Sequence, residues 1–177
     1  MYDELTEVDI RKMQEEIDHR VRVLRPQLIE EVQTARAFGD LSENYEYKCA
    51  KQAKNRNESR IRYLERMIRT AKVIAPESGD DTVGLFDKVT MFNEMIKKEM
   101  TIQIVTTLRQ DALKNRISKE SPVGKALLGR RVGDRVHVTV SPELGYDVEI
   151  RAIEKGQDDD SLEISAYWMI RWGFSTR

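Results

Sequence analysis

The stretch Arg36-Ala-Phe-Gly-Asp-Leu-Ser-Glu-Asn-Tyr-Glu-Tyr47 joins two long helical patterns of the sequence. Gly39 marks the end of the first pattern, since glycine is the usual residue just past a helix C-terminus, where the backbone turns left-handed. The second pattern begins within a few residues. A short connection between two helices favours antiparallel neighbours. The stretch is therefore expected to form the tip of a long helical hairpin.

The first helical pattern covers residues 7–38 and begins at a capping signal. Thr6 and Asp9 are three residues apart, as the two partners of a capping box are. Pro26 lies inside the pattern and cannot donate the hydrogen bond of a regular helix, so a kink is expected within residues 22–26. Apolar residues recur every three or four positions along one face: Ile10, Met13, Ile17, Val21, Leu24, Leu28, Val32 and Ala35.

The second helical pattern has a matching face, formed by Tyr47, Ala50, Ala53, Asn57, Ile61, Leu64, Ile68 and Ala71. Near the tip this face carries small residues, which favours a close approach of the two backbones. Asn57 is a polar residue in the middle of the face, and a buried asparagine can fix the register of paired helices. We interpret Asn57 as register-fixing. Residues 1–75 are thus predicted to form a coiled-coil hairpin.

The hydrophobic period changes beyond a polar linker at residues 76–82, which contains both proline and glycine. Segments that alternate apolar and polar side chains, or that are β-branched, are predicted to be strands: 88–92, 100–105, 135–140 and 146–153. Ser121 and Pro122 suit the cap and first position of a short helix that Gly129 closes. The sequence therefore predicts an α+β fold, in which a small, mostly antiparallel β domain over residues 83–155 follows the hairpin.

Composition narrows the class of protein. The formal net charge is −1, yet residues 48–72 carry nine lysines and arginines against two glutamates, and such a run can be an interaction surface. The single cysteine, Cys49, excludes an intrachain disulfide and favours a reducing cytoplasm. The acidic N-terminus is unlike a signal peptide, and no apolar run approaches the ~18 residues of a membrane helix. We expect a cytoplasmic protein with no membrane partner.

The tip carries the residues with the clearest chemical potential. Asp40 and Glu43 are three residues apart and can bring their carboxylates together. Mg²⁺ takes oxygen ligands, often one or two protein carboxylates together with waters and phosphate oxygens. The pair would make half of a metal site that a partner completes. The same spacing is also typical of a helix N-cap with its capping-box acid, so a structural role stays open.

Basic residues flank these acids. Lys48, Lys51 and Lys54 are expected to lie opposite a segment that contains Arg36 and few acids. Their charge is therefore less neutralised within the hairpin than the charge near the linker. They are candidates for holding a phosphate backbone. His19 and His137 are isolated in the sequence, and no Cys/His metal-binding spacing occurs.

The tip residues 35–47, the upstream Leu24-Arg-Pro26 and the segment Ser121-Pro-Val-Gly-Lys-Ala-Leu-Leu-Gly-Arg-Arg-Val-Gly-Asp134 together resemble the bacterial Gre transcript-cleavage factors of the GreA/GreB family, GreA more than GreB. The resemblance covers about residues 5–155. It implies a coiled-coil hairpin followed by an FKBP-like domain. It also implies binding to the largest subunit of RNA polymerase, with the tip inserted through the secondary channel to promote cleavage of the backtracked RNA 3′ end.

The resemblance also assigns roles to residues. Asp40 and Glu43 fall on the tip acids that share a Mg²⁺ with the polymerase, and Arg36 and Lys51 fall on basic positions near the nascent RNA. Ser121 and Pro122 fall in the polymerase-docking loop. Two departures stand out: the stretch after the tip, with Lys48 and Lys54, is more basic than usual, and residues 156–177 extend past the family's ordinary end.

The prediction is a monomeric polymerase cofactor that is not itself an enzyme and has no stably bound cofactor of its own. Two alternatives remain. One is an inhibitor that enters the same channel without promoting cleavage. The other is an FKBP-like prolyl isomerase or chaperone, which the scarcity of aromatic residues disfavours, since residues 76–155 contain only Phe86, Phe92 and Tyr146.

Overall fold

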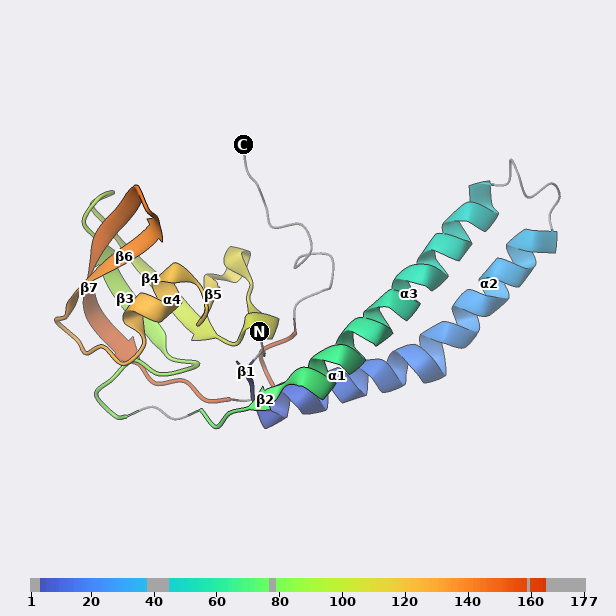
Figure 1. The fold of residues 1–177 in the computed structure, drawn as a ribbon, viewed down its shortest axis with the longest axis horizontal. Helices are drawn as coiled ribbons and strands as arrows, with labels where there is room; N and C mark the ends of the chain where they lie inside the picture. Colours follow the sequence, from blue (N-terminus) through green and yellow to red (C-terminus); the bar gives the residue numbers. More distant parts are fainter. Residues whose placement is uncertain (1–3, 38–44, 77–78, 159, 165–177) are drawn as a thin grey trace. The chain divides into compact units, whose positions relative to one another are not determined.

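The computed structural model describes residues 4–37, 45–76, 79–158 and 160–164 (Figure 1). These residues belong to two compact units. Residues from Ile10 to Ala71 form the first, and Glu4–Asp9 together with the chain from Lys72 onward form the second. The first turn of the first helix therefore belongs with the sheet, although the sequence had placed it wholly in the hairpin. The predicted α+β class is confirmed.

The hairpin unit is built from consecutive helical segments: α1 (Glu7–His19), the π-helical segment η1 (Arg20–Leu24), α2 (Arg25–Ala37) and α3 (Tyr45–Thr70). The irregularity expected within residues 22–26 is thus a π-helical turn that runs directly into α2. Pro26 has no N–H to donate to the preceding turn, and the N–H of Arg25 bonds instead to the carbonyl of Arg20, five residues back. The predicted last residue of the first helix, Phe38, and the helix-ending Gly39 lie outside the described residues.

The two arms of the hairpin run antiparallel. Glu16 contacts Arg60, Arg20 contacts Asn57, and farther along Ala35 and Ala50 line the same groove. The residue numbers of the contacting positions therefore decrease along α3 as they increase along the first arm. The predicted contact face of α3 is confirmed, because Asn57, Ile61 and Leu64 are buried.

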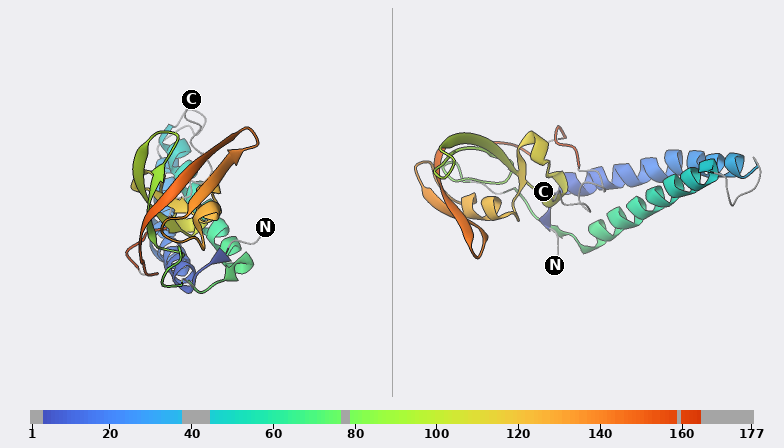
Figure 2. Two further views of the ribbon diagram at one scale, coloured as in Figure 1. Left: turned by 90° about the vertical axis from the view of Figure 1, so that its left-hand side faces the viewer. Right: turned by 90° about the horizontal axis from the view of Figure 1, so that it is seen from above.

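The second unit contains a five-stranded sheet in the order β5-β4-β3-β7-β6 (Figures 1 and 2). The strands are β3 (Lys88–Asn93), β4 (Lys98–Val105), β5 (Arg116–Ser118), β6 (Arg135–Ser141) and β7 (Leu144–Glu154). All four predicted strands are present. The three-residue β5 was not predicted, and it pairs with β4 in parallel, whereas the other pairs are antiparallel.

The core of this unit lies between the sheet and α4 (Pro122–Leu127), with short 3₁₀ turns at Thr107–Arg109 and Ala112–Lys114. Leu127 of α4 packs with Val89, Ile104 and Ile150 from the central strands, and all four side chains are fully buried. The predicted helix ending is also confirmed, because Gly129 adopts a φ of +75°, which L-residues with a Cβ rarely tolerate.

The N-terminal segment is attached to the second unit. Two residues, Glu4–Leu5 (β1), pair in parallel with Lys72–Val73 (β2). The predicted capping box is confirmed: the Thr6 N–H donates to Asp9 Oδ2 at 3.2 Å, and the Asp9 N–H donates to Thr6 Oγ1 at 3.3 Å. The strand pairing was not predicted, because two-residue strands leave no periodicity to detect.

The described part of the C-terminal extension packs on the same unit. The Gly156 N–H donates to Asp87 Oδ1 at 3.0 Å, and a Cβ at position 156 would lie 2.0 Å from the Phe86 carbonyl oxygen, so this close approach requires glycine. Leu162 is buried in the core. Both tryptophans, Trp168 and Trp172, lie outside the described residues.

Candidate functional site

The hairpin tip is defined by the ends of two helices. Helix α2 ends at Ala37 and α3 begins at Tyr45, so residues 38–44 connect the paired ends. The predicted acids Asp40 and Glu43 belong to this connection and lie outside the described residues. Arg36 is described and lies exposed in the last turn of α2.

The three predicted lysines of α3 differ in their surroundings. Lys48 and Lys51 are exposed, and the Lys51 ammonium lies 5.8 Å from the centroid of the Tyr47 ring. Lys54 is half-buried, and its charge is one of the smaller causes that lower the pKa of Glu58; the largest is the hydrogen bond from Arg25. Lys54 is therefore partly committed to charge balance within the hairpin, whereas Lys48 and Lys51 present their charge to solvent.

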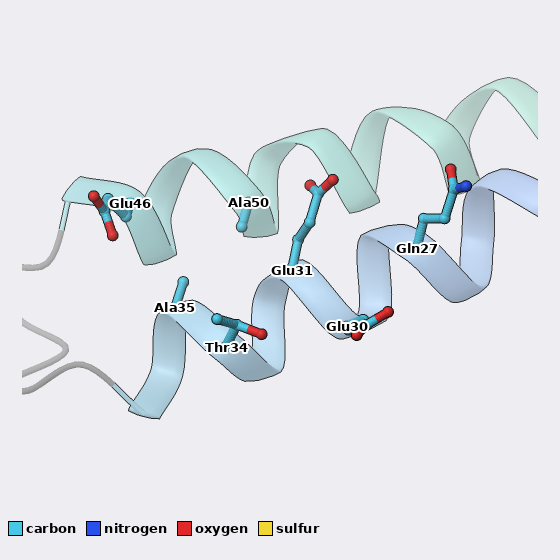
Figure 3. Close-up of a pocket in the computed structure, with 7 residues that line it drawn as sticks. All are labelled: Gln27, Glu30, Glu31, Thr34, Ala35, Glu46 and Ala50. Atoms are coloured by element: carbon cyan, nitrogen blue, oxygen red, sulfur yellow. The ribbon is translucent and has the colours of Figure 1, made fainter.

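A groove of about 560 Å³ lies between α2 and α3 next to the tip (Figure 3). Its lining comprises Gln27, Glu30, Glu31, Thr34 and Ala35 from α2, with Glu46 and Ala50 from α3. Figure 3 shows the side chains of Gln27 and Glu31 pointing from α2 toward α3. Of the described residues that line the groove, three carry carboxylates and none is basic, so this lining is acidic.

Near the tip, Glu46 and the two exposed lysines occupy opposite sides of α3. Glu46 and Ala50 are four residues apart and share the face that lines the groove. Lys48 is two residues from each of them, which on a 3.6-residue turn places it on the opposite side, and Lys51 shares its side. A polyanion near the tip would therefore meet attraction on the outer face of α3 and repulsion at the groove.

The predicted docking residues lie at the start of α4. Ser121 is its N-cap: Oγ accepts from the Gly124 N–H at 3.0 Å and donates to the Ser118 carbonyl at 2.6 Å. Pro122 occupies the first helical position and is exposed. A Cβ on Gly124 would lie 2.3 Å from the Ser118 carbonyl oxygen, so glycine is needed there. Ser121 thus shapes the helix start, while Pro122 is presented on the surface.

Other potential sites are limited. In the part of the chain that the structure describes, no three His, Cys, Asp or Glu side chains gather as metal ligands would. Nor, over the same residues, is any helix long and apolar enough to cross a bilayer. His19 is exposed, and His137 lies on an exposed strand face with Nδ1 2.8 Å from Asp147 Oδ1.

Sequence reasoning identified Asn57 but missed the charged residues around it. Glu16 accepts hydrogen bonds from Arg20 on its own arm and from Arg60 on the other arm, and Arg60 is as buried as Asn57, each being 4 % exposed. Two features of the sequence could have predicted this contact. Glu16 and Arg20 are four residues apart beside the apolar face, and they lie at the level of the asparagine on the other arm.

Comparison with known proteins identifies the family. Residues 4–73 match the family model "Transcription elongation factor, N-terminal", and residues 77–155 match "Transcription elongation factor, GreA/GreB, C-term". The chain is 39 % identical over 146 residues to transcription elongation factor GreA of Mesomycoplasma hyopneumoniae, covering 82 % of this chain and 90 % of that protein. It is 43 % identical over 137 residues to GreA of Thermoanaerobacter pseudethanolicus, covering 77 % and 87 %.

Among solved structures, the GreA factor homolog 1 (Gfh1) protein of Thermus thermophilus is 26 % identical, with a TM-score of 0.40 and coverage of 88 % of this chain and 100 % of that one. Residues 156–177 lie beyond both family matches. Because those two matches together span most of the sequence, the chain belongs to the GreA/GreB family of transcription elongation factors.

Proposed function

We propose that this protein docks on the largest subunit of RNA polymerase at the rim of the secondary channel, inserts its hairpin tip, and stimulates cleavage of backtracked nascent RNA. The observation that carries the proposal is the antiparallel pairing of α2 with α3, which brings Ala37 and Tyr45 to the same end of the hairpin. The seven residues between them contain Asp40 and Glu43, so both carboxylates belong to the segment that would enter a channel first.

The tip acids fit a shared magnesium site. Carboxylate oxygens are the ligands that Mg²⁺ prefers, and it commonly keeps only one or two of them from a protein. Mg²⁺ bound there would lower the pKa of a water molecule and stabilise charge on the phosphate under attack. Asp40 and Glu43 would hold and orient the metal-bound water, while the polymerase supplies the remaining ligands. On this proposal the protein is a cofactor of the polymerase's own nuclease activity.

The basic residues would hold the RNA. Lys48 and Lys51 present their charge on the outer face of α3, and Arg36 is exposed on the last turn of α2. Lys54, being half-buried near Glu58, would contribute more weakly. Repulsion from the acidic groove supports a path for the RNA phosphates along the outer face.

The sheet unit would supply docking through the start of α4, where Pro122 is exposed. We further infer that this unit is FKBP-like. A prolyl-isomerase role gains no support, because the aromatic residues of the sheet unit are dispersed. Phe86 is fully buried, the centroid of the Phe92 ring lies 4.5 Å from Cζ of Arg151, and Tyr146 packs against the core.

The test is a stalled, backtracked elongation complex with RNA labelled at its 3′ end. Addition of the protein with Mg²⁺ should release a short labelled fragment and restore elongation. A channel-binding inhibitor would slow elongation without releasing a fragment, which would overturn the proposed activity. For docking, Pro122→Glu should weaken polymerase binding without changing the melting temperature, and Thr139→Glu, on an exposed position of β6, serves as the matched control.

A further inference from the structure

A cluster of polar and charged side chains crosses the middle of the hairpin at the π-helical turn. Glu16 accepts two hydrogen bonds from Arg60, from Nε and Nη2, each 2.8 Å long, and one from Arg20 Nε at 2.6 Å. Arg20 Nη1 donates to Asn57 Oδ1 at 3.1 Å, and Asn57 Nδ2 donates back to the Arg20 carbonyl at 3.4 Å. We call these four residues the register cluster.

The apolar contact positions of the first arm shift by one residue where this cluster lies. A seven-residue repeat that begins with Ile10, Met13 and Ile17 would continue through positions 27, 31 and 34. The structure instead leaves those positions exposed and buries, fully or in part, the next residue in each case: Leu28, Val32 and Ala35. A π-helical turn accommodates one additional residue within a helix, so η1 absorbs this shift.

The cluster fits one alignment of the two arms. Sliding α3 by one residue would move it about 1.5 Å and turn each side chain by about 100°. Arg56 or Glu58 would then replace Asn57 opposite Arg20, and the paired hydrogen bonds of Asn57 would be lost. The neighbouring apolar contacts discriminate less, because aliphatic side chains of similar size can repack.

The position of the tip depends on this alignment. Tyr45, where α3 begins, is twelve residues from Asn57, or about 18 Å along the helix. A change of register at the cluster would therefore be carried to the tip as a shift of more than 1 Å. Misplacement of that size can slow a reaction by about 100-fold.

We propose that Glu16, Arg20, Asn57 and Arg60 are positioning residues that select a single hairpin register and thereby set the reach of the tip carboxylates into the polymerase. This inference rests on the proposed cleavage function for its consequence, but the register itself can be measured without polymerase. A role in stability alone makes a different prediction. Breaking a cluster that served only stability should lower the melting temperature, whereas replacing a buried polar group by an apolar one of similar size is otherwise often neutral or stabilising.

The decisive variant is Asn57→Leu, with Asn55→Leu, an exposed asparagine on the same helix, as the matched control. In a Cys49→Ser background, spin labels at Gln33→Cys and Gln52→Cys report the distance between the arms, since both positions are exposed. We expect one narrow distance distribution for the otherwise unchanged protein and for Asn55→Leu, and a broad or double distribution for Asn57→Leu at an unchanged or higher melting temperature.

Cleavage assays should distinguish Asn57→Leu from the Asn55→Leu control in the same way. Asn57→Leu should lower the maximal rate of RNA cleavage by about tenfold or more while the half-saturating concentration stays within about twofold, because docking is made by the other unit. Asn57→Asp, which keeps an acceptor for Arg20, should recover most of the rate. A narrow distribution with an undiminished rate in Asn57→Leu would overturn the inference, as would a loss of rate that merely follows a loss of stability.

Two safeguards keep the result interpretable. If Asn57→Leu does not fold, Arg20→Met removes the same contact from the other arm and is read by the same distances. If the unchanged protein releases no RNA fragment, the proposed function fails, whereas a broadened distance distribution in the variant would still support register selection by the cluster.

Discussion

Nη2 of Arg109 lies 2.7 Å from Oδ1 of Asp158, and the arginine side chain is fully buried. The same guanidinium contacts Asp9 in the first turn of α1, with Nε 2.5 Å from Oδ1, and lies 5.0 Å from the centroid of the Phe86 ring. Asp158 comes after residue 155, where the family match ends. The extension therefore supplies part of the charge balance for a buried arginine that also holds the N-terminal segment.

Asp158→Asn should destabilise the sheet unit. Removing one partner of a buried ion pair can cost ~3–5 kcal/mol, and because Asp9 still contacts Arg109 we expect a loss of about 2 kcal/mol in the free energy of unfolding. Hydrogen exchange should also rise at the amides of the first turn of α1. Chemical denaturation and exchange of the full-length protein measure both effects.

Glu163→Gln is the matched control, because Glu163 is an exposed acid of the same extension. Equal stability of Asp158→Asn and Glu163→Gln would show that Asp158 adds nothing to the balance that Asp9 already provides.

Local pattern was sufficient for the elements that position the tip. The capping pair of Thr6 and Asp9, the repeat of apolar residues and Pro26 together predicted the first arm and the place of its irregularity, because each signal acts within a few residues. Asn57 was predicted as a register residue for the same reason, since its neighbours on the helix define a face.

The missed features depend on residues far apart in the chain. Arg109 and Asp158 are separated by 49 positions, and neither carries a local signal that names its partner. The strand β5 has three residues and the strands β1 and β2 have two each, too short for an alternating pattern. The roles of Asp40 and Glu43 stay predictions, because these residues lie outside the described part of the chain.

The stability of the hairpin should depend on the ionisation of Glu16. Burial opposes ionisation of this carboxyl, but hydrogen bonds from Arg60 and Arg20 outweigh burial and hold its pKa below the ordinary value of 4.5. Because the pKa of Glu16 is lowered in the folded state, ionised Glu16 stabilises the hairpin fully at pH values above the ordinary pKa of the carboxyl. This contribution is lost as the pH falls through the folded-state pKa.

We therefore expect the free energy of unfolding to fall more steeply between about pH 5 and about pH 3 in the unchanged protein than in Glu16→Gln. Urea unfolding followed by helix content at several pH values provides the measurement. Glu15→Gln, an exposed neighbour, should retain the steep dependence. Parallel curves for the unchanged protein and Glu16→Gln would contradict the assigned role.

Lys51→Ala should weaken engagement of the RNA without affecting folding, because its exposed ammonium sits on the outer face of α3. Each lost phosphate contact should reduce the slope of log affinity against log salt by about 0.7 for a single strand. Crosslinking of the RNA 3′ segment at several salt concentrations reports this slope. Lys98→Ala, an exposed lysine of β4, should leave it unchanged; a salt-independent defect in Lys51→Ala would indicate packing rather than phosphate contact.

The double variant Asp40→Asn/Glu43→Gln should be silent in cleavage yet compete with the unchanged protein. Both substitutions keep side-chain size and remove an anionic metal ligand. Losing even an outer partner of a metal site costs ~10–100-fold, so the loss here should be at least that large. The proposed docking residues at the start of α4 are unchanged in this variant, so at equal concentration it should halve the cleavage stimulated by the unchanged protein. A full-length competitor is required, because a fragment beginning at residue 76 would lack strands β1 and β2 and the Asp9 partner of Arg109.

Thermal melting distinguishes a metal-binding role of Asp40 and Glu43 from a purely structural one. If the two residues serve only as a helix cap, the variant should lose ~0.5–2 kcal/mol of stability and retain cleavage in proportion to the amount of folded protein. Failure of a stably folded variant to compete would place the main polymerase anchor at the tip instead of at Pro122.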